Sequence, residues 1–402
     1  MEEHPQARFI INTLTKAGFL AYYAGGWVRD YLLKHPSDDI DIATNAPPET
    51  IQALFSHTVP IGIAFGIILV IIDGHQYEVA TFRQDLDYKD GRRPSRVAFT
   101  SAIEDAKRRD FTINGMFYDP LQDKILDYVQ GREDLEKKII RAIGDPHVRI
   151  QEDRLRMIRA VRLSCRFNFI IEPKTEEAIR FHAKELFPAV AIERIWQELV
   201  KGHAFHKLAQ MLISLHKYGL LSAIFPVLET VSLKEIEKRL EPVTQYPKDA
   251  PVIASLLPLF PHYTLDDALN LCKKLKLPNE DLQFVTFFFH FKKLTEGKNI
   301  ERYEWAHAYA NPLAEMCLQI LFGKQKLMNE HQKRREELKN AICRIEQRNP
   351  VIKSSDLMQE GILPGKTMGL LLKEAEKIAI NEQIEDRERI LVLLKSSPLW
   401  PV

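Results

Sequence analysis

The chain has 402 residues and a formal net charge of +1, with 45% hydrophobic and 28% charged residues. This length allows two or three domains with buried cores, and the composition is ordinary for a soluble globular protein. The longest uncharged run, residues 59–72, is too short to span a bilayer, which excludes a membrane-spanning chain.

The cysteines and the N-terminus both indicate a cytoplasmic protein. Cys165, Cys272, Cys317 and Cys343 lie far apart without a Cys-x-x-Cys motif, which is typical of reduced thiols. The first five residues have the pattern of neither a signal peptide nor a transit peptide. We therefore expect no membrane contact.

The first ordered segment ends in a pair of glycines. Residues 5–18 have helical spacing, and Leu20–Ala24 predicts a strand that runs into Gly25 and Gly26 before another helix. Adjacent glycines let the backbone approach a bound group, and the helix N-terminus offers N–H groups to anions. Arg29 would add a positive charge for a phosphate. The alternative is a tight turn with Arg29 and Asp30 as surface charges.

Residues 38–44 predict a strand with two carboxylates on one face. Asp39 and Asp41 alternate with Ile40 and Ile42, so the acids project together while the isoleucines enter the core. Mg²⁺ takes one or two carboxylates and leaves room for substrate phosphates. Alone, this pattern is weak evidence, since surface acids also produce it.

Residues 58–82 predict a strand pair with Asp73 and Gly74 as the turn. In the second strand, Glu78 shares a face with Ala80 and Phe82. It is either a third carboxylate of the metal site or a solvent-facing residue of a half-buried strand, and both readings stay open.

The charged segment Gln84–Phe99 has no periodicity and predicts a long, mobile, functional loop. Order resumes at Lys107–Asn114. There Asp110 and Asn114 can hydrogen-bond hydroxyl groups beside Arg109, although basic pairs are commonly solvated.

From Pro146 onward we expect helices. Within residues 151–162, helical spacing places Asp153, Arg156 and Arg159 on one broad face, with Arg162 turning away. One interpretation is a set of surface ion pairs. The other is base recognition: Asp accepts from an exocyclic amino group and Arg donates to the ring nitrogen, a pattern that adenine and cytosine share.

Residues 174–402 predict a succession of amphipathic helices. Phe284, Phe287, Phe288, Phe289 and Phe291 are expected in the core. Lys324–Arg348 predicts one long basic helix, which is either a track for a phosphate backbone or a solvated surface.

Five motifs in order resemble one family. They are Gly25–Asp30, Asp39–Thr44, Arg108–Asn114, Glu152–Arg159 and Glu193–Ile195. Together they are similar to class II tRNA nucleotidyltransferases (CCA-adding enzymes) and bacterial poly(A) polymerases, within the DNA polymerase β superfamily.

The resemblance implies an α+β fold: a nucleotidyltransferase head with a mixed β-sheet and flanking helices, followed by all-α neck, body and tail domains. We place these domains at residues 1–145, 146–205, 206–320 and 321–402, with the tail binding tRNA. The implied partners are the tRNA 3′ end, ATP and CTP. The implied reaction is CCA addition through two Mg²⁺ ions held by Asp39 and Asp41, without a nucleic-acid template.

The resemblance also implies roles for individual residues. Glu78 sits where the superfamily often has a third catalytic carboxylate. The nucleotide-binding residues fall into four groups: Gly26, Arg29 and Arg109 on the phosphates, Asp110 and Asn114 near the ribose, Asp153 and Arg156 on the base, and Arg159 and Arg162 supporting the triphosphate. In the family, the loop matching Gln84–Phe99 helps to switch the pocket from CTP to ATP.

Other functions stay open on the sequence alone. The closest rival is an A-adding enzyme, either half of a split CC/A pair or a poly(A) polymerase, because the Asp153–Arg156 pair accepts both bases. A non-catalytic RNA-binding module on a decayed transferase fold is a more distant alternative. The sequence leaves the oligomeric state unknown.

Overall fold

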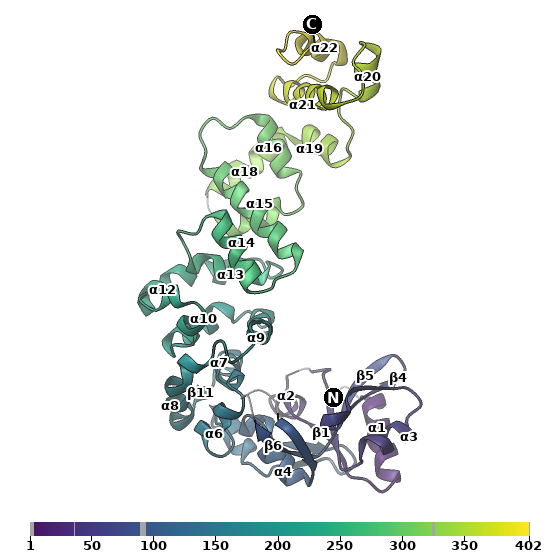
Figure 1. Cartoon of the computed structure of the whole chain (residues 1–402), viewed down its shortest axis with the longest axis vertical. Helices are drawn as coiled ribbons and strands as arrows, with labels where there is room; N and C mark the ends of the chain where they lie inside the picture. The colour runs from purple at the N-terminus through teal and green to yellow at the C-terminus, as the bar shows by residue number, and fades with distance from the viewer. Residues whose placement is uncertain (1–3, 36, 89–93, 324–325, 402) are drawn as a thin grey trace. The chain divides into compact units, whose positions relative to one another are not determined.

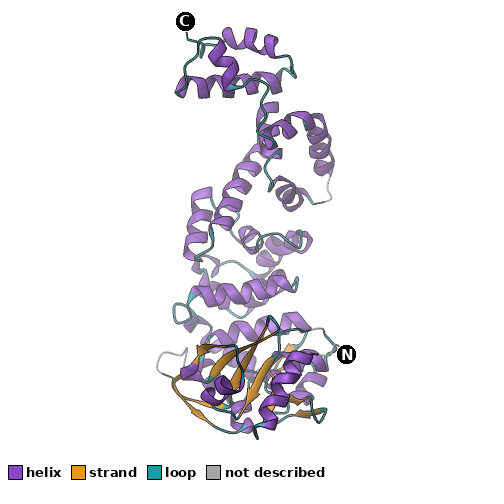
Figure 2. Ribbon diagram, turned by 90° about the vertical axis from the view of Figure 1, so that its right-hand side faces the viewer, coloured by secondary structure: helices purple, strands orange, loops and turns teal. Residues whose placement is uncertain are grey.

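The computed structural model describes residues 4–35, 37–88, 94–323 and 326–401. The chain divides into two compact units, Met1–Lys238 and Arg239–Val402. Strands and helices combine in the first unit, whereas the described part of the second unit is built from helices (Figures 1 and 2). The predicted α+β class is confirmed. The finer division at residues 145, 205 and 320 stays a prediction.

The first unit contains a seven-stranded sheet with the order β3-β4-β5-β2-β1-β8-β9. Only β2 and β5 pair in parallel, and the other neighbours are antiparallel, so the predicted mixed sheet is confirmed. The strands are β1 (Ala21–Ala24), β2 (Asp41–Thr44), β3 (Thr58–Gly62), β4 (Ile67–Ile72), β5 (His75–Thr81), β8 (Phe117–Asp119) and β9 (Lys124–Leu126).

The aspartate strand lies in the interior of this sheet. β2 begins at Asp41, one residue after the buried Ile40, and Asp39 precedes it outside the strand. Ile42 and Ala43 are buried between β1 and β5, which fixes the register of Asp41 opposite Ala24. The strand is therefore shorter than predicted. Asp41 is its first residue, and the side chain of Asp41 alternates with the buried Ile42 as predicted.

A tight turn and five helices accompany the strands of the sheet. The turn between β4 and β5 is formed by Asp73 and Gly74 as predicted, and both have positive φ, at 50° and 80°. The helices of this region are α1 (Pro5–Lys16), α2 (Gly26–Leu32), α3 (Pro48–Leu54), α4 (Ala102–Lys107) and α5 (Gly131–Glu136).

The predicted loop Gln84–Phe99 is not an open loop. β6 (Arg83–Tyr88) pairs antiparallel with β7 (Pro94–Phe99), and residues 89–93 between them lie outside the described residues. The expectation was wrong because charged side chains do not prevent pairing when they can stay in water, and the ladder satisfies the backbone groups.

The predicted continuous helix over residues 151–162 is also wrong. α6 (Pro146–Glu152) ends before Asp153, and α7 (Leu155–Phe167) begins two residues after it. Asp153 has extended backbone, with φ −149° and ψ 102°, and its carboxylate accepts from the N–H of Leu155 at 3.1 Å. Such a side chain offers the backbone an alternative to the helix, which interrupts it there.

Helices account for most of the remaining first unit. They are α8 (Pro173–His182), α9 (Ile192–Ala204), α10 (Leu208–Lys217), α11 (Leu220–Ile224) and α12 (Leu233–Leu240), with α12 crossing into the second unit. A short parallel pair, β10 (Ile139–Ile140) with β11 (Ile170–Ile171), joins this region to the chain before α6.

The second unit contains ten helices among its described residues. They are α13 (Val252–Leu256), α14 (Leu265–Lys274), α15 (Asn279–Glu296), α16 (Arg302–Tyr309), α17 (Ala314–Phe322), α18 (Lys326–Glu337), α19 (Lys339–Glu346), α20 (Ser354–Gln359), α21 (Lys366–Asn381) and α22 (Arg387–Lys395). No helix in the described ranges is long and apolar enough to cross a membrane. Of the five phenylalanines predicted in the core, Phe284, Phe288 and Phe291 are buried, whereas Phe287 and Phe289 are only half-buried.

The predicted long basic helix is two helices, because the chain turns at the buried Leu338 between α18 and α19. Several of its cations are held within the protein. Arg334 stacks over Trp305 at 4.4 Å, and Arg344 pairs with Glu385 at 2.7 Å. Lys324 lies outside the described residues.

Candidate active site

Asp39, Asp41 and Glu78 lie near the N-terminal end of β2. The parallel register of β2 with β5 pairs Ile42 with Val79, so Asp41 lies beside Glu78, and Asp39 precedes Asp41 by two residues. Burial, and then the charges of Asp39 and Glu78, raise the pKa of Asp41 to about 6, against the opposing charge of Arg109. Asp41 is nevertheless exposed to solvent at the start of β2. A site with this excess of negative charge suits a cation.

The donor set fits a hard divalent ion with open positions. All three groups offer carboxylate oxygens, and one or two carboxylates with substrate phosphates suffice for Mg²⁺. Within the described ranges, no group of three or more His, Cys, Asp or Glu side chains could hold a metal ion. Glu78 is therefore near the aspartates without completing a ready three-carboxylate site.

Gly25 lies between the carboxylate of Asp41 and the guanidinium of Arg109. Its φ is 70°, and a Cβ there would stand 3.2 Å from Arg109 Nη1 and 3.3 Å from Asp41 Oδ2. The sequence prediction chose Gly26, whose Cβ would meet only Arg29 of its own helix, at 3.4 Å. The adjacent glycines in the sequence mark this turn without deciding which of the two has the positive φ that glycine tolerates.

Arg109 is fixed by a buried carboxylate that the sequence interpretation missed. Asp105 accepts from Arg109 Nε at 3.2 Å and Nη2 at 3.0 Å, and Arg109 stacks over Phe117 at 5.0 Å. Burial works to raise the pKa of Asp105, but Arg109 and Arg108 give a net lowering.

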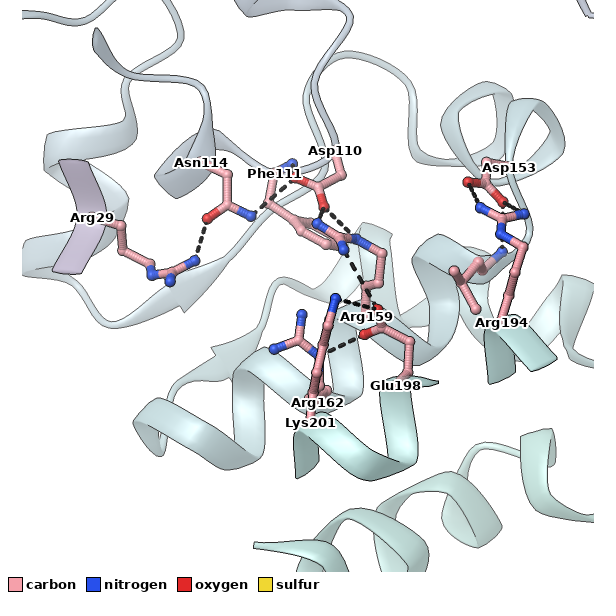
Figure 3. Close-up of polar contacts among 11 residues, drawn as sticks. Arg29, Asp110, Phe111, Asn114, Asp153, Arg159, Arg162, Arg194, Glu198 and Lys201 are labelled. Atoms are coloured by element: carbon pink, nitrogen blue, oxygen red, sulfur yellow. Dashed lines mark hydrogen bonds and ion pairs between the residues drawn. The ribbon is translucent and has the colours of Figure 1, made fainter. Parts of the chain in front are cut away.

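A chain of polar contacts runs from Arg29 to the helices that follow the sheet (Figure 3). Arg29 is buried, and it donates to Asp30 at 2.9 Å and to Asn114 Oδ1 at 2.6 Å. Asn114 donates in turn to Asp110 at 3.0 Å, and Asp110 pairs with Arg159 at 2.6 Å. The structure thus brings these four predicted residues together through direct contacts.

Asp110 is the charged centre of that chain. Burial would raise its pKa, but the charge of Arg159 and the hydrogen bonds from Asn114 and Arg159 hold the pKa well below its usual range. Both Asp110 oxygens are engaged, because Oδ1 also accepts from the N–H of Phe111 at 2.8 Å.

Arg159 and Arg162 are connected through a second carboxylate that the prediction missed. Glu198 of α9 is buried, lies 2.5 Å from Arg162 Nε and 3.6 Å from Arg159 Nη1, and stands close to Lys201 (Figure 3). Burial lowers the pKa of Arg162, and the charge of Glu198 opposes that shift. No periodicity in the sequence links residues 159 and 198.

The predicted base-reading pair has separate partners. Asp153 receives both terminal nitrogens of Arg194, at 2.7 and 3.2 Å (Figure 3). Arg156 donates to Glu152 at 2.7 Å and to the carbonyls of Arg149 and Arg108. Because the helix breaks at Asp153, the two side chains do not share a helical face as predicted. The sequence analysis gave Arg194 no role, although the residue lies in the fifth motif, Glu193–Ile195.

An acidic strand edge, an arginine across a glycine and an arginine-bearing helix define a nucleotidyltransferase. The family described as "Poly A polymerase head domain" matches residues 21–141, and "Probable RNA and SrmB- binding site of polymerase A" matches residues 168–231.

Comparison with curated proteins gives the particular family. A CCA-adding enzyme of Streptococcus mutans is 33% identical over 399 residues, 97% of this chain and 96% of the relative. One of Bacillus subtilis is 43% identical over 220 residues, 54% of this chain and 55% of the relative. The crystal structure of the Bacillus stearothermophilus CCA-adding enzyme in complex with CTP has a TM-score of 0.77 at 28% identity, covering 98% of this chain and 97% of that one. The chain belongs to the family of CCA-adding enzymes.

Replacing Gly25 by alanine tests the close approach at the acidic edge. We expect Gly25→Ala to lower nucleotide addition at least about 100-fold, because a displacement of the reacting groups by 1 Å has that order of effect. The matched control is Gly18→Ala, which has φ 87° and no atom within 4 Å of its Cβ. Near-normal activity of Gly25→Ala, measured in steady-state assays, would contradict the assignment.

The Asp110 ion pair predicts a pH-dependent stability. Because the pKa of Asp110 is lower in the folded than in the unfolded protein, its contribution is complete above the unfolded pKa of about 4 and is lost as pH falls below it. We expect Asp110→Asn to lower the free energy of unfolding by about 3 kcal/mol near neutrality.

The difference between Asp110→Asn and the wild type should narrow by about 1 kcal/mol from pH 6 to pH 3 in urea unfolding. Glu136→Gln, which removes an exposed carboxylate of α5, serves as the control and should show little change at either pH. A constant difference for Asp110→Asn would show that its charge is not what stabilises the fold.

Proposed function

We propose that this chain is a tRNA nucleotidyltransferase that adds CCA to the tRNA 3′ end from CTP and ATP. The observation that carries the proposal is the meeting of Asp41 and Arg109 across Gly25, which puts a cation site next to a phosphate-binding charge. Family membership over nearly the whole chain supports it, as does the fold shared with a relative solved with CTP.

Members of this family generally use a divalent metal ion, and for this chain we propose Mg²⁺ held by Asp39 and Asp41. Bound there, the metal would supply charge neutralisation at the α-phosphate and activation of the RNA 3′-hydroxyl, with pyrophosphate released. Glu78 would add to the negative field that attracts the cation.

The chain's own residues would hold the nucleotide. The N–H groups around Gly26 and the guanidinium groups of Arg109 and Arg29 would bind phosphates. Arg29 is held in a buried position by its hydrogen bond to Asn114. Asp110 and Asn114 would lie near the ribose. Arg159 and Arg162 would support the triphosphate from α7.

Asp153 and Arg156 would read the base. Adenine and cytosine both present an amino donor beside a ring acceptor, which Asp153 and Arg156 complement. Guanine and uracil present the reverse pattern and would leave buried groups unpaired. Since Arg194 occupies both Asp153 oxygens, base binding would need Arg194 to share or release one of them.

The partner and location complete the proposal. The tRNA would bind the helical tail, residues 321–402, and present its 3′ end to the head domain. Cys165, Cys272, Cys317 and Cys343 are all free, which suits a reducing cytoplasm.

Addition to three tRNA transcripts tests this function. They end before the C residues, after CC and after CCA, and each receives CTP, ATP or both with Mg²⁺. Growth of the first to CCA, followed by arrest, is the expected result. Single A addition only after CC would identify an A-adding partner. A long A ladder would identify a poly(A) polymerase, which the head-domain match keeps as the second candidate.

A catalytic control accompanies the transcripts. Asp41→Asn should lower the rate at least about 1,000-fold while leaving RNA binding in place, because metal ligands act mainly in the transition state. Unchanged activity would contradict a metal-dependent transferase at this edge.

Base selectivity provides a separate test. Asp153→Ala should lower the preference for ATP over GTP by about 100-fold in kcat/KM, because the complementary acceptor is lost. The control is Asp145→Ala, which removes a helix-capping carboxylate of α6 that accepts from the N–H groups of His147 and Val148. Equal loss of selectivity in both variants would reduce Asp153 to a structural cap.

A further inference from the structure

Asp105 is a fully buried carboxylate that the proposed mechanism does not use. It lies in α4, which begins after the cap Ser101, and it is 1% exposed. A buried carboxylate is costly unless it is paired and hydrogen-bonded, so its partners show what its position serves.

Three groups from two parts of the chain converge on Asp105. Its Oδ2 accepts both Nε and Nη2 of Arg109. Its Oδ1 accepts from Arg108 Nε at 2.8 Å and from the backbone N–H of Arg83 at 3.1 Å, at the first residue of β6. Figure 1 shows β6 beside α4. One side chain therefore joins the base of the β6–β7 hairpin to two consecutive arginines.

These contacts determine where Arg109 points. With Nε and Nη2 bound to Asp105 and the ring of Phe117 beneath the guanidinium, Nη1 is directed to the space beside Gly25, toward Asp41. The planar fork of arginine can bond a carboxylate on one side and leave its other terminal nitrogen aimed elsewhere. A carboxylate behind the guanidinium thus sets the direction of the forward nitrogen.

We propose that Asp105 is a positioning residue that holds Arg109 over the phosphates of the incoming nucleotide. This inference rests on the proposed function, since it needs Arg109 to meet a nucleotide. According to this proposal, the positive charge of Arg109 is not sufficient for phosphate binding. The guanidinium must also have the orientation that Asp105 imposes. A triphosphate is common to ATP and CTP, so both nucleotides depend on Asp105 equally.

A double-mutant cycle tests the proposal. Asp105→Asn should raise KM for ATP and CTP by a similar factor, on the order of 10-fold to 100-fold, with the ratio between the two nucleotides unchanged. In an Arg109→Ala background, the same change should add less than about 2-fold, because the group it positions is already absent. Asp134→Asn is the matched control.

Asp134 serves as the control because it is also a buried carboxylate that binds an arginine. It accepts from Thr112 Oγ1 at 2.7 Å and from Arg141 Nε at 3.0 Å, and it is not among the residues that a Cβ at Gly25 would meet. Asp134→Asn should lower the free energy of unfolding without raising KM. Any effect that it has on activity should be the same in the wild-type and Arg109→Ala backgrounds. If Asp105→Asn behaves in that way, Asp105 is a structural residue and the proposal is overturned.

A second variant covers the case in which Asp105→Asn does not fold. Arg109→Lys keeps the positive charge but has no fork to bond Asp105 and reach forward together. It should lose nearly as much as Arg109→Ala, and wild-type KM values for Arg109→Lys would overturn the proposal. Absence of nucleotide addition by the unmodified protein would instead contradict the proposed function itself.

Discussion

The ion pair between Asp110 and Arg159 is the interaction on which the candidate site depends. Asp110 follows α4 next to the sheet, whereas Arg159 lies on α7 beyond the last strand of that sheet. Their pairing, extended by Asn114 to Arg29 and by Glu198 to Arg162, joins α2, which follows the Gly25–Gly26 turn, to α7 and α9. Without it, the half-buried Asp110 would lose its counter-charge, and removing one partner from such a pair is expensive.

A second constraint works in the opposite sense at the edge of β2. There the fold crowds Asp39, Asp41 and Glu78, and burial together with these charges outweighs the counter-charge of Arg109 and leaves Asp41 with a raised pKa. The crowding disfavours the ligand-free ionised state, and a divalent cation relieves it. The same molecule thus contains a compensated polar chain for rigidity and an uncompensated acidic edge for binding.

The outline of the fold was predicted from the sequence better than several of its local geometries were. The mixed sheet, the Asp73–Gly74 turn and the meeting of Arg29, Asp110, Asn114 and Arg159 agree with the sequence interpretation. The helix break at Asp153, the β6–β7 hairpin and the turn at Leu338 do not. In each of these places, a side-chain cap, a strand partner or a core position outweighed local periodicity, and such long-range competition leaves no mark in a short window of sequence.

The sequence by itself determined the chemistry: carboxylates at alternate positions, a glycine pair before a helix, and arginines at helical spacing. These are properties of neighbouring residues, so spacing is enough to find them. Only the tertiary structure decided which groups meet. Gly25 rather than Gly26 lies beside Arg109 and Asp41, Arg194 meets Asp153, and Glu198 meets Arg162, because folding brings these residues together. The helical turn of α4 likewise places Asp105 against Arg109. Contact between distant residues follows from burial and shape, which spacing along the chain does not encode.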